Sequence, residues 1–187
     1  MSMPLPDRHW TVDDLATLPD DGNRYEILDG ELLVTPAPSW RHHRIIGLLY
    51  SLILDYLRAH SVGDVVLAPA DVVFAPDTSV LPDLFVAPLV EGRKPRSSKE
   101  AGRLLLAVEV LSPGTMRHDR YRKRPRYQEE QVAECWIVDG AARVVERWRP
   151  LDELPEVLKE TLSWQPDPAH PPLMIDLPAV FREAGED

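Results

Sequence analysis

The middle of this 187-residue chain contains the run Leu104-Leu105-Leu106-Ala107-Val108-Glu109-Val110-Leu111. Seven of its eight residues are apolar. A strand this apolar is typical of the centre of a sheet that is covered on both faces. The run therefore predicts a central β-strand, and the segments on either side of it are expected to supply the neighbouring strands and the covering helices.

Two further signals precede this run in the sequence. Residues 24–28 and 31–34 are extended around Asp29-Gly30, a dipeptide that favours a two-residue hairpin turn. Residues 39–60 carry apolar side chains at helical spacing, which predicts a long helix with one buried face. Further strands are expected at 65–67, 71–74, 83–87, 134–138 and 143–148, further helices at 12–18 and 116–130, and a last short element at 173–181.

The order of these elements predicts an α/β (α+β) fold with a mixed central β-sheet flanked by helices and an N-terminal β-hairpin. A chain of this length predicts one domain over residues 1–187. Residues 1–10 are expected to be an N-terminal tail, and 150–172 a proline-rich, irregular excursion.

Composition excludes several classes of protein. One cysteine, Cys135, rules out an internal disulfide framework and a cysteine-only zinc site. The longest mostly apolar stretch, 45–54, is too short to span a bilayer, and residues 1–10 do not resemble a signal peptide, so a cytoplasmic protein with no membrane partner is expected. The chain has no HExxH zinc spacing, glycine-rich phosphate loop or GxSxG elbow, which disfavours a metalloprotease, a nucleotide kinase and an α/β-hydrolase.

The charge is unevenly distributed along the chain. The net charge of −10 argues against a general nucleic-acid coat protein. Residues 93–126 nevertheless carry a net charge of +8, and the remainder of the chain carries −18. The positive segment could form a local field for a phosphate ligand, or it could simply solvate an exposed loop and helix.

Two carboxylates are the best candidates for chemistry. Glu109 interrupts the apolar run, and an ionised carboxylate there is costly unless it is paired, protonated or bound to a cation. Pro82-Asp83 is ordinary turn chemistry by itself. On a strand next to Glu109, however, Asp83 would complete a pair of oxygen ligands that suits Mg²⁺, with the main-chain carbonyl of Val110 as a further ligand. The alternative for Glu109 is a structural salt bridge.

Three other polar residues could assist these carboxylates. Lys123 follows the central strand and could stabilise charge that develops on a phosphoryl group, or it could lie on a solvated face or pair with Asp119. Pro125 predicts that the regular helix begins near Arg124, with Lys123 at its entry. Glu26 alternates with apolar residues, and His42 opens the long helix, where a histidine is usually exposed or a local cap.

Taken together, these segments resemble the Uma-two family of restriction-endonuclease-like proteins, within the PD-(D/E)XK nuclease superfamily. The similarity runs from about residue 11 to 148, and 173–181 is similar to the family's last segment. The matching pieces, in order, are 24–32 (RYEILDGEL), 38–42 (PSWRH), 82–84 (PDL), 108–113 (VEVLSP), 119–123 (DRYRK) and 136–139 (WIVD).

The resemblance implies a restriction-endonuclease-like core and phosphodiester hydrolysis of nucleic acid, expected to be DNA, with Mg²⁺ or Mn²⁺. Asp83 and Glu109 match the two acidic positions of the motif. Leu111 stands where the superfamily usually has lysine, and Lys123 matches the position to which that lysine has moved. Glu26 and His42 match further positions that line the pocket.

The chain also departs from the family pattern, and other functions stay open. Gln131 replaces the usual glycine, and Cys135 replaces an aromatic residue. A nuclease fold can also serve as a catalytically inactive interaction or regulatory module, or as a metal-dependent hydrolase of a smaller phosphodiester. A homodimer is expected only by analogy with enzymes that cut both strands of a duplex.

Overall fold

The computed structural model describes residues 8–35 and 39–185. Most of the predicted N-terminal tail, and the prolines at 36 and 38, therefore lie outside the described residues. The first elements are α1 (Val12–Leu15), β1 (Arg24–Leu28), β2 (Glu31–Thr35), α2 (Trp40–Ala59), β3 (Gly63–Leu67), β4 (Val72–Ala75) and β5 (Thr78–Val80). The others are β6 (Leu84–Pro88), α3 (Ser98–Ala101), β7 (Leu106–Val110), α4 (Met116–His118), η1 (Asp119–Lys123), α5 (Arg124–Glu129), β8 (Cys135–Asp139), β9 (Val144–Trp148), β10 (Glu156–Leu158), β11 (Thr161–Trp164), β12 (Leu173–Asp176) and α6 (Leu177–Ala184).

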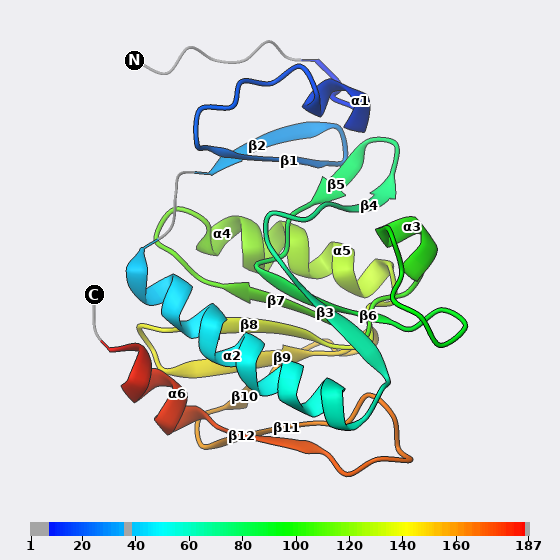
Figure 1. The fold of residues 1–187 in the computed structure, drawn as a ribbon. Helices are drawn as coiled ribbons and strands as arrows, with labels where there is room; N and C mark the ends of the chain where they lie inside the picture. Colours follow the sequence, from blue (N-terminus) through cyan, green and yellow to red (C-terminus); the bar gives the residue numbers. More distant parts are fainter. Residues whose placement is uncertain (1–7, 36–38, 186–187) are drawn as a thin grey trace.

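The central strand lies where the apolar run predicted it. The larger sheet has the order β10-β9-β8-β7-β6-β3, with β7 and β8 parallel and the other neighbours antiparallel. All five residues of β7 are buried. Successive side chains of a strand point to opposite faces, so β7 contributes to two cores. Helices α2 and α6 cover one face (Figure 1), and the other core includes Tyr127 of α5.

The N-terminal hairpin belongs to a second, smaller sheet with the order β2-β1-β5-β4. Asp29 and Gly30 form its turn, both with positive φ (54° and 77°), as the dipeptide predicted. Thr11 and Asp14 form a capping box at the start of α1. This sheet lies above the larger one in Figure 1, with α4 and α5 near the junction. Glu26 of β1 is thereby brought towards the central strand.

Some expectations about the strands need correction. The segment 150–172 is not wholly irregular, because it contains β10 and β11. Strand β10 extends the larger sheet, and β11 pairs with β12. Strand β5 was not predicted, since its three residues are too few to show a period. None of the helices in the described parts of the chain combines the length and apolar character needed to cross a bilayer.

Candidate active site

The pairing of β6 with β7 brings Asp83 and Glu109 together. Leu84 lies opposite Val108 in this antiparallel pair. Asp83 precedes Leu84 and Glu109 follows Val108, so continuation of the register places the two carboxylates opposite each other on one face. Asp83 is 4% exposed and Glu109 is 2% exposed. The structure thus brings the two predicted acids to one buried place.

Asp83 is held by three donors from different parts of the chain. Its Oδ2 accepts the backbone N–H of Val110 at 2.9 Å and lies 3.1 Å from His42 Nε2. Its Oδ1 accepts a hydrogen bond from the Arg24 guanidinium at 2.7 Å. Burial by itself would raise the pKa of Asp83, but the hydrogen bond with His42 and the positive charges of Arg24 and Lys123 hold this pKa well below its usual range. Asp83 is therefore a carboxylate at neutral pH.

Lys123 reaches the site because its helix is not regular. In η1 the backbone N–H of Arg124 donates to the carbonyl of Asp119, five residues back, which is a π-helical bond. Lys123 is the last residue of this turn and is 2% exposed. The regular helix begins at Arg124, as Pro125 predicted, and the alternative of a solvated face for Lys123 is wrong.

The ammonium group of Lys123 contacts two buried carboxylates. Nζ lies 2.7 Å from Glu109 Oε1 and 2.9 Å from Glu26 Oε1. It also donates to the backbone carbonyl of Leu81 at 3.3 Å, and Asp119 Oδ1 is farther away, at 3.9 Å. Burial alone would lower the pKa of Lys123, but the surrounding carboxylates, Glu109 first, raise it above its usual value. Lys123 is thus a fixed cation and a hydrogen-bond donor, rather than a base.

Glu109 receives a second donor from the same helix. The hydroxyl of Tyr127, which is fully buried, donates to Glu109 Oε1 at 2.5 Å. Tyr127 and Lys123 thus both contact Oε1. Burial raises the pKa of Glu109 well above its usual range, an effect that Lys123 opposes and the neighbouring carboxylates reinforce. The site therefore favours a further positive charge, or a proton, near Glu109.

These side chains surround a small cavity with room for about 20 Å³, which is the space of roughly one water molecule or ion. Four buried carboxylates and two cations, Arg24 and Lys123, line it. With every carboxylate ionised and His42 neutral, this set has a formal charge of −2. The lining consists of Arg24, Glu26, Thr35, His42, Asp83, Glu109, Ser112, Thr115, Asp119 and Lys123.

The donor set suits a hard divalent cation, because one such ion would cancel the excess charge of −2 and carboxylate oxygens are its preferred ligands. Within residues 8–35 and 39–185, no three His, Cys, Asp or Glu side chains form a ready-made metal cluster. A cation here would therefore depend on few side chains, with main-chain oxygen and water completing its shell. Mg²⁺ is commonly bound in this way.

Three of the residues that sequence reasoning missed contact Asp83, Glu109 or Lys123. Arg24 is two residues from Glu26, so both lie on one face of β1. Tyr127 follows Lys123 by four residues, a spacing that places the two on one helix face. Asp119 was weighed only as a pairing partner of Lys123, yet its buried carboxyl has a raised pKa, chiefly through desolvation. Strand and helix spacing could have indicated that Arg24 accompanies Glu26 and that Tyr127 and Asp119 accompany Lys123, but not that these segments meet at one cavity.

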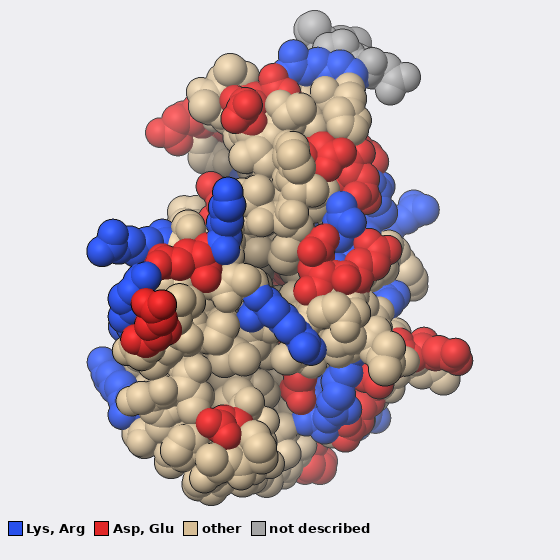
Figure 2. Space-filling view, turned by 90° about the vertical axis from the view of Figure 1, so that its right-hand side faces the viewer, with Lys and Arg blue, Asp and Glu red and all other residues tan. Residues whose placement is uncertain are grey.

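The basic segment 93–126 is extensively paired within the protein. Figure 2 shows Lys and Arg side chains interspersed with Asp and Glu side chains over the face of the molecule that it draws. Its ion pairs include Arg93–Glu100 (2.6 Å), Lys94–Asp64 (2.6 Å), Arg120–Glu146 (2.7 Å), Arg122–Glu31 (2.9 Å) and Arg126–Asp29 (2.8 Å). These pairs compensate much of the positive charge of the segment.

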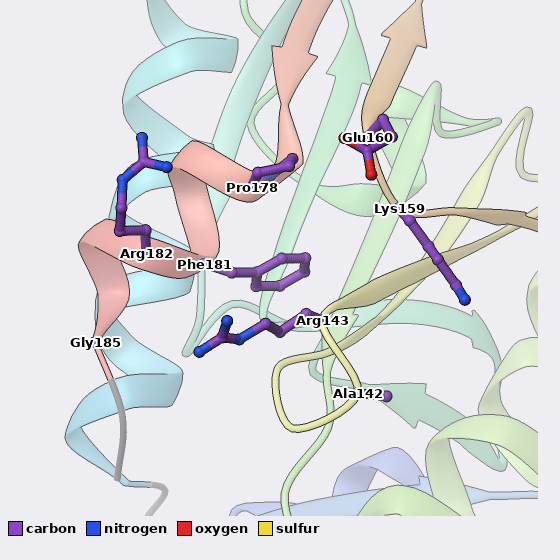
Figure 3. Close-up of a pocket in the computed structure, with 8 residues that line it drawn as sticks. All are labelled: Ala142, Arg143, Lys159, Glu160, Pro178, Phe181, Arg182 and Gly185. Atoms are coloured by element: carbon purple, nitrogen blue, oxygen red, sulfur yellow. The ribbon is translucent and has the colours of Figure 1, made fainter.

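A larger cavity, of about 590 Å³, lies away from the carboxylates, against α6. Lys159 and Arg182 are among the residues that line it, together with Phe181. In Figure 3 the charged ends of Lys159 and Arg182 point in different directions. This cavity does not focus charge on one point, so the smaller carboxylate cavity is the better candidate for chemistry.

Comparison with protein families supports the resemblance noted in the sequence. The family model "Uma2: Putative restriction endonuclease" matches residues 12–178. The chain belongs to the Uma2 family. The match includes Glu26, Asp83, Glu109 and Lys123, so these four residues of the cavity lie within the matched part of the chain. Comparison with curated proteins gives no match.

A solved structure shares the fold. It is described as the crystal structure of a putative nuclease belonging to DUF820 from Anabaena variabilis ATCC 29413. The superposition has a TM-score of 0.74 at 20% sequence identity, and it covers 94% of this chain and 99% of the other. The predicted α/β fold with a mixed central sheet flanked by helices is confirmed, as is membership of the Uma2 family.

Proposed function

We propose that this protein is a Mg²⁺- or Mn²⁺-dependent endonuclease that hydrolyses phosphodiester bonds of DNA. The observation that carries the proposal is the convergence of Asp83, Glu109 and Lys123 on one small, negatively charged cavity. Membership of a family described as a restriction endonuclease supports the same type of reaction. A homodimer would allow two such sites to act on the two strands of a duplex.

Asp83 and Glu109 would hold the cation, together with the carbonyl of Val110. A bound divalent cation supplies positive charge against the phosphate and makes a neighbouring water molecule more acidic. Lys123 stays protonated, so it can orient the attacking water and stabilise negative charge on the phosphoryl oxygens. Glu26 or His42 would complete the site, either as a second carboxylate ligand or as a carrier for the proton of the water.

The test is nicking of a supercoiled plasmid with Mn²⁺ or Mg²⁺. We expect activity in the wild type, loss of activity in Glu109→Ala, and retention in Glu183→Ala, which changes an exposed glutamate on α6. In parallel, Mn²⁺ should raise the Tm of the wild type but not that of Asp83→Ala, because only a folded protein with an intact site binds the ion.

Three results would overturn the proposal in different ways. Cleavage of a small chromogenic diester without nicking would assign a metal-dependent hydrolase of smaller substrates. Cleavage of RNA but not DNA would replace the substrate. The absence of both cleavage and a Mn²⁺-dependent rise in Tm would assign a nuclease-like module that acts through interactions.

A further inference from the structure

A second cavity adjoins the carboxylate site, and His42 and Ser112 line both. It has a volume of about 120 Å³. Its walls are the first turn of α2, the segment that follows β7 and the turn between β8 and β9. The cavity therefore lies directly beside the proposed site of cleavage, but it is formed by different groups, among them Arg41 and Gly140.

Arg41 brings to this cavity a positive charge that no direct ion pair compensates. It is only 9% exposed and donates one hydrogen bond, from Nη2 to the carbonyl of Gly140 at 2.6 Å. Its buried Nε has no partner, and no acidic side chain in the described part of the chain forms an ion pair with it. Asp139 also lines the cavity, but its oxygens accept from Arg120 and from the backbone of Ala142. A buried cation without a counter-charge is costly.

One further feature of α2 acts in the same direction. The cavity also lies at the N-terminus of a 20-residue helix, whose dipole favours negative charge. The unpartnered Nε–H of Arg41 and the positive end of the helix together favour an anion.

We propose that this cavity binds a phosphate group of the nucleic-acid strand, adjacent to the phosphate that is cleaved. This inference rests on the proposed function. A volume of 120 Å³ is well below the ~300–1,000 Å³ of sites for larger ligands, so it suits a phosphate group rather than a whole nucleotide. Gly140 keeps the space open, because a Cβ there would lie 3.9 Å from Arg41 Nε and 2.9 Å from Ile45 Cδ1.

The test measures Tm in EDTA with inorganic phosphate or with a 5′-phosphorylated oligonucleotide. At ten times the Kd, either ligand should raise the Tm of the wild type by about 3–6 °C. Arg41→Met should abolish the rise without lowering the Tm in phosphate-free buffer, since it removes an unpaired buried charge. Gly140→Ala should reduce it, because its Cβ would occupy part of the cavity beside Arg41. The control Arg44→Met removes an exposed charge three residues along α2 and should retain the rise.

Oligonucleotide binding gives a second measurement. In Arg41→Met the slope of log K against log salt should decrease by about 1, as expected for one lost phosphate contact. A phosphate-dependent rise in Tm that persists in Arg41→Met would overturn the site. Binding of inorganic phosphate without binding of the oligonucleotide would overturn the assignment to a strand.

Failure of the proposed function would look different. Glu109→Ala should lose cleavage yet keep the phosphate-dependent rise in Tm, because its side chain does not line the second cavity. If the wild type cleaves nothing while Arg41→Met still abolishes phosphate binding, the endonuclease assignment fails and the phosphate site stands.

Discussion

Replacing Lys123 with methionine tests the charge balance of the buried site. The ammonium group lies 2.7 Å from Glu109 and 2.9 Å from Glu26, and methionine would leave both carboxylates without it. Removing one partner of a buried ion pair costs roughly 3–5 kcal/mol of unfolding free energy. For a domain of this size, that loss corresponds to a fall in Tm of roughly 6–20 °C. Urea unfolding followed by circular dichroism at pH 8 measures the difference.

The loss in Lys123→Met should also depend on pH, with a definite sign. Burial raises the folded-state pKa of Glu109 above its usual value of 4.5, so the folded protein holds that proton more tightly than the unfolded chain. The stabilisation that the folded state gains from protonated Glu109 is therefore complete below pH 4.5, and it is lost as the pH rises through the folded-state pKa of Glu109. Because Lys123 opposes the rise, its removal moves that pKa higher still. The variant should lose less stability at pH 5 than at pH 8.

The matched control is Lys159→Met, which changes an exposed lysine that forms no ion pair with a described residue. Its unfolding free energy should change by less than about 0.5 kcal/mol. A loss below about 1 kcal/mol in Lys123→Met, or a loss equal at both pH values, would refute the charge balance inferred for the site.

Three further substitutions test neighbouring features. Tyr127→Phe removes the hydroxyl that donates to Glu109 at 2.5 Å, so we expect the unfolding free energy, measured in urea, to fall by about 1–3 kcal/mol. We also expect weaker Mn²⁺ binding by calorimetry. Unchanged Mn²⁺ affinity would contradict the role of Tyr127 in positioning Glu109. Gln131→Gly should raise the unfolding free energy by about 1 kcal/mol, because φ at this position is 57°, and Gln131→Ala should give no such gain. Gly63→Ala should lower the Tm through a loss of about 1–3 kcal/mol, since its Cβ would stand 2.7 Å from the carbonyl of Ala87; a variant as stable as the wild type would show that the strands can separate there.

The glycine that the family resemblance implies at position 131 has a clear physical reason. Gln131 follows the C-terminus of α5, where its N–H donates to the carbonyl of Gln128 and the N–H of Val132 donates to that of Tyr127. This pair of bonds is the Schellman motif, which requires a left-handed residue. The sequence alone could not predict this helix end, because glutamine does not signal a left-handed conformation.

Local signals predicted the parts of the fold that depend on neighbours in sequence. The Asp29-Gly30 turn, the long helix α2 and the central strand each follow from a short pattern. Glu109 was identified because burial of a carboxylate among apolar residues is costly wherever the strand lies. By contrast, the contacts of Arg24 and Asp119 with the cavity depend on segments far apart in sequence, so no pattern within one segment could establish them.

The position of Lys123 follows from the geometry of its helix. In an uninterrupted α-helix the ring of Pro125 would meet the carbonyl of Tyr121, and this conflict argued against placing Lys123 in a regular turn. The π-helical turn changes the register of bonding, because the N–H of Arg124 donates to Asp119 rather than to the residue four back. The same turn directs both of its end residues, Asp119 and Lys123, to the interior. The proline and the buried ammonium group of Lys123 are therefore compatible within one continuous helical segment.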